Sequence, residues 1–184
     1  MNKTLVIVIA LVAVLAIFGI SSYNGLVGMN ENVNGKWSQI ENQLQRRADL
    51  IPNLVNTVKG YAAHEQQAIQ AVADARAKLA GASGPAAKAQ ANGELNSALS
   101  RLLVIAENYP NLKADQNFRS LMDELSGTEN RIAVARKDYN DAVQVYNTKI
   151  RSFPSSMFAG MFGFGPKEYF KAEEGAKQVP QVKF

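Results

Sequence analysis

The stretch LVGMNENVNGKWSQIENQLQRRADLI, residues 26–51, decides the fold of this chain. Its apolar positions follow one another at steps of three or four residues, which is the spacing of one face of an α-helix. These positions are Leu26, Met29, Val33, Trp37, Ile40, Leu44, Ala48 and Ile51. The stretch therefore predicts a long amphipathic helix whose apolar side packs against other helices.

Toward the N-terminus this pattern gives way to an unbroken apolar run, LVIVIALVAVLAIFGI, residues 5–20. No charged residue occurs between Lys3 and Glu31, and a membrane-spanning helix needs roughly 20 mostly apolar residues. Because backbone amides in lipid must be paired within the segment, a single span has to be helical. We therefore predict a transmembrane anchor over residues 1–29. Its membrane residues are Leu5, Val6, Ile7, Val8, Ile9, Leu11, Val12, Val14, Leu15, Ile17, Phe18 and Ile20.

A cleaved signal peptide is the alternative interpretation of this run, because a small-x-small site occurs at residues 19–21. The apolar region of a signal peptide usually has about 7–15 residues, so an uncleaved anchor is favoured. The charges specify the orientation of the span in the membrane only weakly. Lys3 precedes the span, whereas Lys36, Arg46 and Arg47 follow it. The balance leans toward a cytoplasmic N-terminus and an exported domain.

Beyond residue 51 the helical periodicity continues and no alternating strand pattern occurs, so we predict an all-α fold. The apolar stripe extends without a clear break to Leu79, and GASGP at residues 81–85 stops that helix and starts the next. A third helix over about residues 85–108 ends at Tyr109-Pro110. A fourth follows over about residues 118–150 and stays in phase across the weak point at residues 126–127.

Pro52 leaves two arrangements open. If Asp49 caps a new helix and the chain reverses there, residues 30–152 form an antiparallel, up-and-down four-helix bundle. If Pro52 only kinks one long helix, the result is a bent hairpin with Pro110 roughly opposite. We favour the bundle, because four helices share one core, whereas a hairpin leaves half of each apolar stripe in water.

The C-terminal part has a different composition, FPSSMFAGMFGFGPKEYF over residues 153–170, followed by a tail at 171–184 that we expect to be disordered. An apolar stretch of this size should not be left in water. It either contacts a membrane surface or a neighbouring subunit, or folds back onto its own bundle. Its candidate interaction residues are Phe153, Phe158, Phe162, Phe164 and Phe170.

A charged cluster, Arg46, Arg47 and Asp49, is the second candidate interaction site. It could dock a partner or a second subunit. It could equally be an internal polar network at a helix junction, with Asp49 capping free amides.

Several chemistries are excluded by what the chain lacks. It has no cysteine and one histidine, His64, so neither a thiolate nor a His-cluster metal site can form. His64-Glu65 does not complete HExxH, because position 68 is Ala68. Beyond residue 30 the chain contains 19 of its 20 Lys and Arg residues and all 16 of its Asp and Glu residues. The basic residues do not form a stripe, so we expect no binding to nucleic acid. We therefore expect no enzyme, no cofactor and no metal.

Two long strings carry a family resemblance: WSQIENQLQRRADLIPNLVNTVKGYAAHE, residues 37–65, and ENYPNLKADQNFRSLMDELSGTENRIAVARKDYNDAVQVYNTKIRSFP, residues 107–154. They resemble the signature of the LemA family, and the match continues to KAEEGA. The resemblance implies a bacterial protein with an N-terminal membrane helix, a four-helix domain and an undefined biochemical function. Some such relatives are associated with building intracellular membrane compartments. The family is often described with its short N-terminus outside, which keeps the orientation open.

These features together predict a single-pass protein of the bacterial cytoplasmic membrane. Its helical domain would act as a scaffold that binds itself, as a homo-oligomer with coiled-coil-like contacts, or binds other envelope proteins. The alternative is a membrane-tethered sensor or adaptor that binds a small ligand or a peptide in the bundle, and this requires a concave pocket with convergent polar groups.

Overall fold

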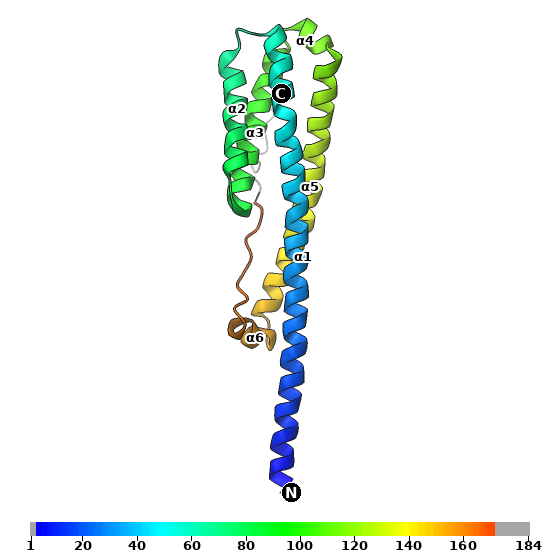
Figure 1. The fold of residues 1–184 in the computed structure, drawn as a ribbon, viewed down its shortest axis with the longest axis vertical. Coiled ribbons are helices and arrows are strands. Elements are labelled where there is room, and N and C mark those ends of the chain that lie inside the picture. Colours follow the sequence, from blue (N-terminus) through cyan, green and yellow to red (C-terminus); the bar gives the residue numbers. More distant parts are fainter. Residues whose placement is uncertain (1–2, 172–184) are drawn as a thin grey trace, which may run out of the picture. The chain divides into compact units, whose positions relative to one another are not determined.

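The computed structural model describes residues 3–171, and within them every regular element is a helix (Figure 1). The helices are α1 (Lys3–Tyr61), α2 (Gln66–Gly81), α3 (Gly84–Ala106), α4 (Pro110–Ala114), α5 (Gln116–Arg151) and α6 (Ser155–Met161). The prediction of an all-α fold with one long apolar N-terminal helix is therefore confirmed. From residue 172 on, the tail that we expected to be disordered lies outside the described residues.

The reversal that we favoured at Pro52 is wrong, because α1, which has 59 residues, continues through this proline to Tyr61. A proline inside a helix lacks the N–H that would bond to the carbonyl four residues earlier, here that of Ala48. Arg76 of α2 supplies the missing donor, with its Nε 2.8 Å from the Ala48 oxygen. Asp49 consequently lies inside an unbroken helix and has no free amides to cap. The chain leaves α1 at Tyr61 and turns over residues 62–65 instead.

The other boundaries follow the local signals in the sequence. α2 ends at the predicted GASGP stop, and α3 begins with Pro85 in its first turn. Gly84 precedes that proline at a φ of +79°, in the left-handed region that favours glycine. α5 passes through residues 126–127 without interruption, as expected. The five-residue helix α4 between Tyr109 and Asp115 was not anticipated.

The described chain divides into two units, which we treat separately. The body unit contains residues 38–137 and 169–171, and the stem unit contains residues 3–37 and 138–168. Both α1 and α5 contribute residues to each unit.

The core of the body unit is built from the predicted stripes of four helices. Full burial of a large aliphatic or aromatic side chain contributes roughly 1.5–3 kcal/mol. The buried residues include Ile40, Leu44, Ile51, Leu54 and Val58 of α1, Val72 and Leu79 of α2, Leu95 and Leu102 of α3, and Phe118, Leu125 and Ile132 of α5.

The stem unit has its own core, in which α1 packs against the second half of α5. Tyr139 and Tyr146 are buried there, as predicted from the inward stripe. The Tyr139 ring lies 5.4 Å from that of Trp37, and its hydroxyl donates to the backbone carbonyl of Glu168 at 2.7 Å. Burial, and then the charge of Glu168, raise the pKa of Tyr139 to about 12.

The segment after α6 is held to α5 through the Asn147 side chain. Its Nδ2 donates to the carbonyl of Lys167, and its Oδ1 accepts from the Lys167 amide, each at 2.8 Å. This pair of bonds satisfies a buried amide side chain and returns the chain beside α5 after α6.

Candidate functional site

Apart from Gly19, which is buried, the apolar run of α1 is exposed in the stem unit. All twelve predicted membrane residues, from Leu5 to Ile20, are exposed. Within the described residues α1 is long and apolar enough to cross a membrane, by length and composition. A continuous exposed surface of this size does not persist in water and is typical of a surface covered by lipid or protein.

The Phe-rich segment folds back onto α1 at the end of this apolar run. The ring of Phe158 lies 5.8 Å from that of Phe18, and a Cβ built on Gly19 would stand 3.1 Å from the same Phe158 ring. Tyr23, one turn further on, holds the rings of Phe162 and Phe164 at 4.9 and 5.9 Å. A side chain at position 19 would therefore require the Phe158 ring to move by a few tenths of an ångström.

The remaining two phenylalanines of the segment have opposite environments. Phe170, in the body unit, is buried, whereas Phe153 is 82% exposed. The five candidate phenylalanines thus do not form one surface. Three contact α1, one is buried elsewhere, and one faces outward.

Arg47 is the buried polar centre of the body unit. It lies inside the core with 3% of its surface exposed. Its Nη1 donates to Asn92 Oδ1 at 2.8 Å and also pairs with Glu129, while its Nη2 donates to Asn96. Asn96 closes the cluster by donating to Glu129 Oε1 at 3.3 Å. This Arg47 cluster ties α1, α3 and α5 together.

The electrostatics of the cluster are those of a buried ion pair. Burial lowers the pKa of Arg47, and the charge of Glu129 and its hydrogen bond act in the opposite direction. A guanidinium still keeps its proton at neutral pH, so Glu129 balances a buried positive charge. Among the described side chains none accepts a hydrogen bond from Arg47 Nε. A hollow of about 290 Å³ borders the cluster, and Arg47, Asn96 and Glu129 are among its lining residues.

Arg46 and Asp49 have different surroundings from Arg47. Arg46 pairs with Glu124 of α5 at 2.6 Å, and Arg131 shares the same carboxylate at 3.1 Å. Asp49 accepts a bond from Gln45 on its own helix at 2.8 Å. The three predicted residues therefore do not form one cluster, and a docking role for the exposed side chain of Arg46 remains a prediction.

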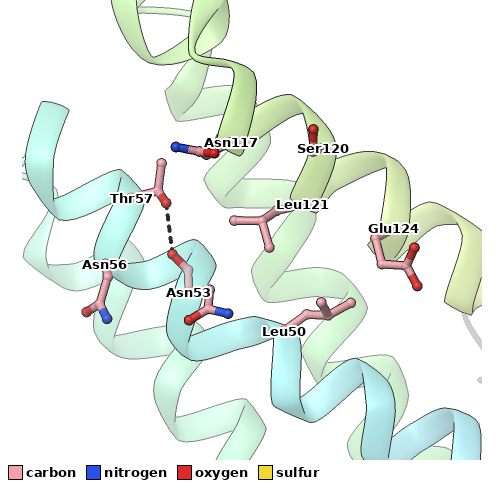
Figure 2. A pocket seen from close by; sticks show the side chains of 8 residues that line it. All are labelled: Leu50, Asn53, Asn56, Thr57, Asn117, Ser120, Leu121 and Glu124. Carbon is pink, nitrogen blue, oxygen red and sulfur yellow. Dashed lines mark hydrogen bonds between the residues drawn. The ribbon is translucent and has the colours of Figure 1, made fainter.

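A polar groove of about 540 Å³ runs between α1 and α5 in the body unit. Figure 2 shows its lining side chains, of which Asn53, Asn56 and Thr57 come from α1 and Asn117, Ser120 and Glu124 from α5. Leu50 and Leu121 supply apolar contact area. The Thr57 hydroxyl is already used, because it donates to the Asn53 carbonyl at 2.9 Å. The amides and hydroxyls could hydrogen-bond a peptide or a small polar ligand.

Sequence reasoning missed the partners of Arg47 and Arg76. Asn92 and Asn96 are four residues apart and lie beside Leu95 and Leu99 of the apolar stripe of α3. This spacing could have indicated that both amide side chains are on the inward side of the helix. In residues 3–171 no group of three or more His, Cys, Asp or Glu side chains could hold a metal ion.

Comparison with known proteins finds one matching family model and several similar proteins. The model of the LemA family matches residues 36–184. Magnetosome protein MamQ 1 and Magnetosome protein MamQ 2 of Paramagnetospirillum magneticum are each 31% identical to the chain, over 87% of this chain and 68% of theirs. Magnetosome protein MamQ of Magnetospirillum gryphiswaldense is 30% identical with the same coverage.

Proposed function

This chain belongs to the LemA family, and on that basis we propose that it is a scaffold anchored by a single span in the bacterial cytoplasmic membrane. In this role α1 holds the protein at the lipid surface, and the helical domain organises further copies or partner proteins there. The observation that carries the proposal is the exposed apolar run of α1, whose length and composition suit a membrane span. The role is non-catalytic.

The relatives support a role of this kind by their names. Three similar proteins are described as magnetosome proteins. We propose that this chain also acts at a membrane-bounded structure, but we do not propose that this structure is a magnetosome.

A further part of the proposal is that the body unit works as an antiparallel four-helix bundle. Its members are α2, α3 and the parts of α1 and α5 that lie within that unit. The Arg47 cluster links three of them, the Arg76 bond adds α2 to α1, and the Lys78–Glu94 pair at 2.7 Å joins α2 to α3. A bundle of this kind offers outer helix faces for contacts with partners.

The test is cross-linking of the full-length protein in native membranes, followed by mass determination in detergent. The proposal expects a discrete homo-oligomer or a reproducible partner. A variant lacking residues 5–20 is the matched control, because it keeps the domain but loses the anchor. A strictly monomeric protein without a co-purifying partner would contradict the scaffold role.

The groove between α1 and α5 favours a second candidate function, a membrane-tethered sensor or adaptor. Its volume and its facing Asn, Ser and Thr side chains suit a peptide or small polar ligand. Ser120→Trp would fill the groove, whereas Ser97→Trp on α3 leaves it open and serves as the control. If a peptide library yields no binder that Ser120→Trp weakens and Ser97→Trp spares, this second function fails.

A further inference from the structure

The outer face of α6 carries an apolar surface that no residue of the stem unit covers. Met157 and Met161, four residues apart on this helix, are 63% and 75% exposed. The opposite face is internal, because Ser155 and Ala159 are buried. Phe153, just before the helix, is also largely exposed. The exposed face of α6 is therefore apolar, and its buried face is made of small residues.

The place where α6 contacts α1 coincides with one end of the apolar run. At about 1.5 Å per residue, the segment from Lys3 to Tyr23 is about 30 Å long, which matches the hydrocarbon core of a bilayer. Tyr23 then lies at the membrane–water boundary, where tyrosine is favoured. Phe162 and Phe164 contact Tyr23 and therefore lie at this boundary. Phe158 contacts Phe18 and Gly19 and lies about one helical turn deeper.

The charged residues of the segment that contains α6, residues 142–167, are all positive. From residue 142 to residue 167 the chain contains no Asp or Glu, whereas it contains Lys149, Arg151 and Lys167. Lys149 and Arg151 form the basic last turn of α5, directly before α6. Cations close to a bilayer are attracted to anionic lipid headgroups, each contributing modestly to binding.

From these observations we propose that α6 is a second membrane element, lying in the headgroup region beside α1 with Phe153, Met157 and Met161 directed into lipid. The inference rests on the proposed anchor, which α6 contacts through Phe158. A seven-residue helix binds lipid weakly alone, but its attachment to α1 supplies a high local concentration. The element would set the depth and tilt of the stem unit in the membrane.

A lipid surface fits these residues better than a second copy of the chain. The helix α6 contacts α1 at the end of the exposed span, and the charged residues between positions 142 and 167 are all positive. Two identical copies would bring these cations together without compensating carboxylates from the same segment.

Spin labelling tests the proposal in the full-length protein, because the chain has no native cysteine. Met157→Cys and Met161→Cys carry the label on the outer face of α6. Ile9→Cys reports the span, and Val134→Cys reports an exposed apolar position in the middle of α5, in the body unit. The protein is placed in nanodiscs of phosphatidylcholine and phosphatidylglycerol. Label collisions are measured with oxygen, which concentrates in lipid, and with a water-soluble nickel complex.

The proposal expects the oxygen-to-nickel collision ratio at both α6 positions to lie between those of Ile9 and Val134, and several-fold above that of Val134. It expects the same ratio in discs that hold a single copy. Values equal to Val134 while Ile9 reports lipid would overturn the interfacial role alone. Nickel exclusion that disappears in single-copy discs would assign the face to a second copy and would also overturn it. A nickel-accessible Ile9 would refute the anchor, and this inference with it.

Discussion

At the scale of single residues, Arg47 shows how a charge placed on an apolar stripe acquires its role. It lies one position before Ala48 on the inward side of α1, so the helix carries it into the core. A buried guanidinium is costly unless its charge is balanced and its donors are bonded. Glu129 balances the charge of Arg47, and Asn92, Asn96 and Glu129 accept from its Nη1 and Nη2 atoms, whereas Nε has no acceptor among the described side chains. Its position in the structure is therefore determined by three residues that are distant in sequence.

Arg47→Ala should lower the free energy of unfolding by about 3 kcal/mol, since it removes a buried ion-pair partner and leaves Asn92 without its donor. Arg47→Lys should recover only part of the loss, because an ammonium cannot reach three acceptors in the geometry of a guanidinium. Urea denaturation of the full chain in detergent measures both. Arg46→Ala, at an exposed ion pair, should cost less than about 1 kcal/mol. Equal losses for Arg46→Ala and Arg47→Ala would contradict this account.

Asp115 makes the stability depend on pH at the start of α5. Its Oδ1 accepts from the Phe118 amide and its Oδ2 from the Tyr61 hydroxyl, each at 2.9 Å. These bonds, the first being the stronger cause, lower the pKa of Asp115 below its ordinary value of 3.8. A lowered carboxyl pKa contributes stability that is present above the ordinary value and is lost as the pH falls through the folded-state pKa.

Asp115→Asn should therefore lower the Tm at neutral pH, and its difference from wild type should shrink as the pH falls below 3.8. Thermal melts over a pH series provide the measurement. Asp123→Asn, at an exposed carboxylate of the same helix, is the control and should show a smaller effect. A Tm difference for Asp115→Asn that is independent of pH would rule out the ionised cap.

At the scale of elements, the continuity of α1 depends on a contact from outside the helix. Pro52 removes one intrahelical hydrogen bond, and Arg76 of α2 satisfies the Ala48 carbonyl that is released. Local sequence around Pro52 cannot contain this information, because the donor is 24 residues further on. The same bond joins α2 to α1 beside the position that local signals mark as a break.

A double-mutant cycle can isolate this compensation. Arg76→Ala should destabilise the wild type by about 1 kcal/mol, because the Ala48 carbonyl is left unpaired. In the Pro52→Ala background the restored amide can bond to that carbonyl, so the same Arg76→Ala change should cost much less. Additive effects in the four urea denaturation curves would contradict the compensation.

At the scale of the whole molecule, the long apolar run divides the chain into a part suited to lipid and a part suited to water. Deleting residues 5–20 should move the protein from the carbonate-resistant membrane fraction to the supernatant, with the helical circular-dichroism signal of the remaining chain retained. Immunoblotting of fractionated cells measures the shift. If the protein without the deletion is instead recovered in the supernatant as a form that has lost its first residues, the signal-peptide alternative is supported.

The orientation of the domain is a separate question at this scale, and a compartment-sensitive reporter fused to Phe184 answers it. The weak charge balance around the span leans toward an exported domain, while the usual description of the family has the opposite orientation.

Local features of the sequence determined the class of fold, the apolar span and most helix boundaries. These features are local, because a helix face, a glycine-proline stop or a run without charges is defined by neighbouring residues. The apolar stripe did not indicate the turn at residues 62–65, because Val58 and Ile69 stay roughly in phase across it. Only the tertiary structure decided that Pro52 is tolerated, that Arg47 meets Asn92 and Glu129, and that Phe158 reaches Gly19. Each of these depends on a partner from another helix, and the pairing of distant residues is determined by packing instead of by the local pattern.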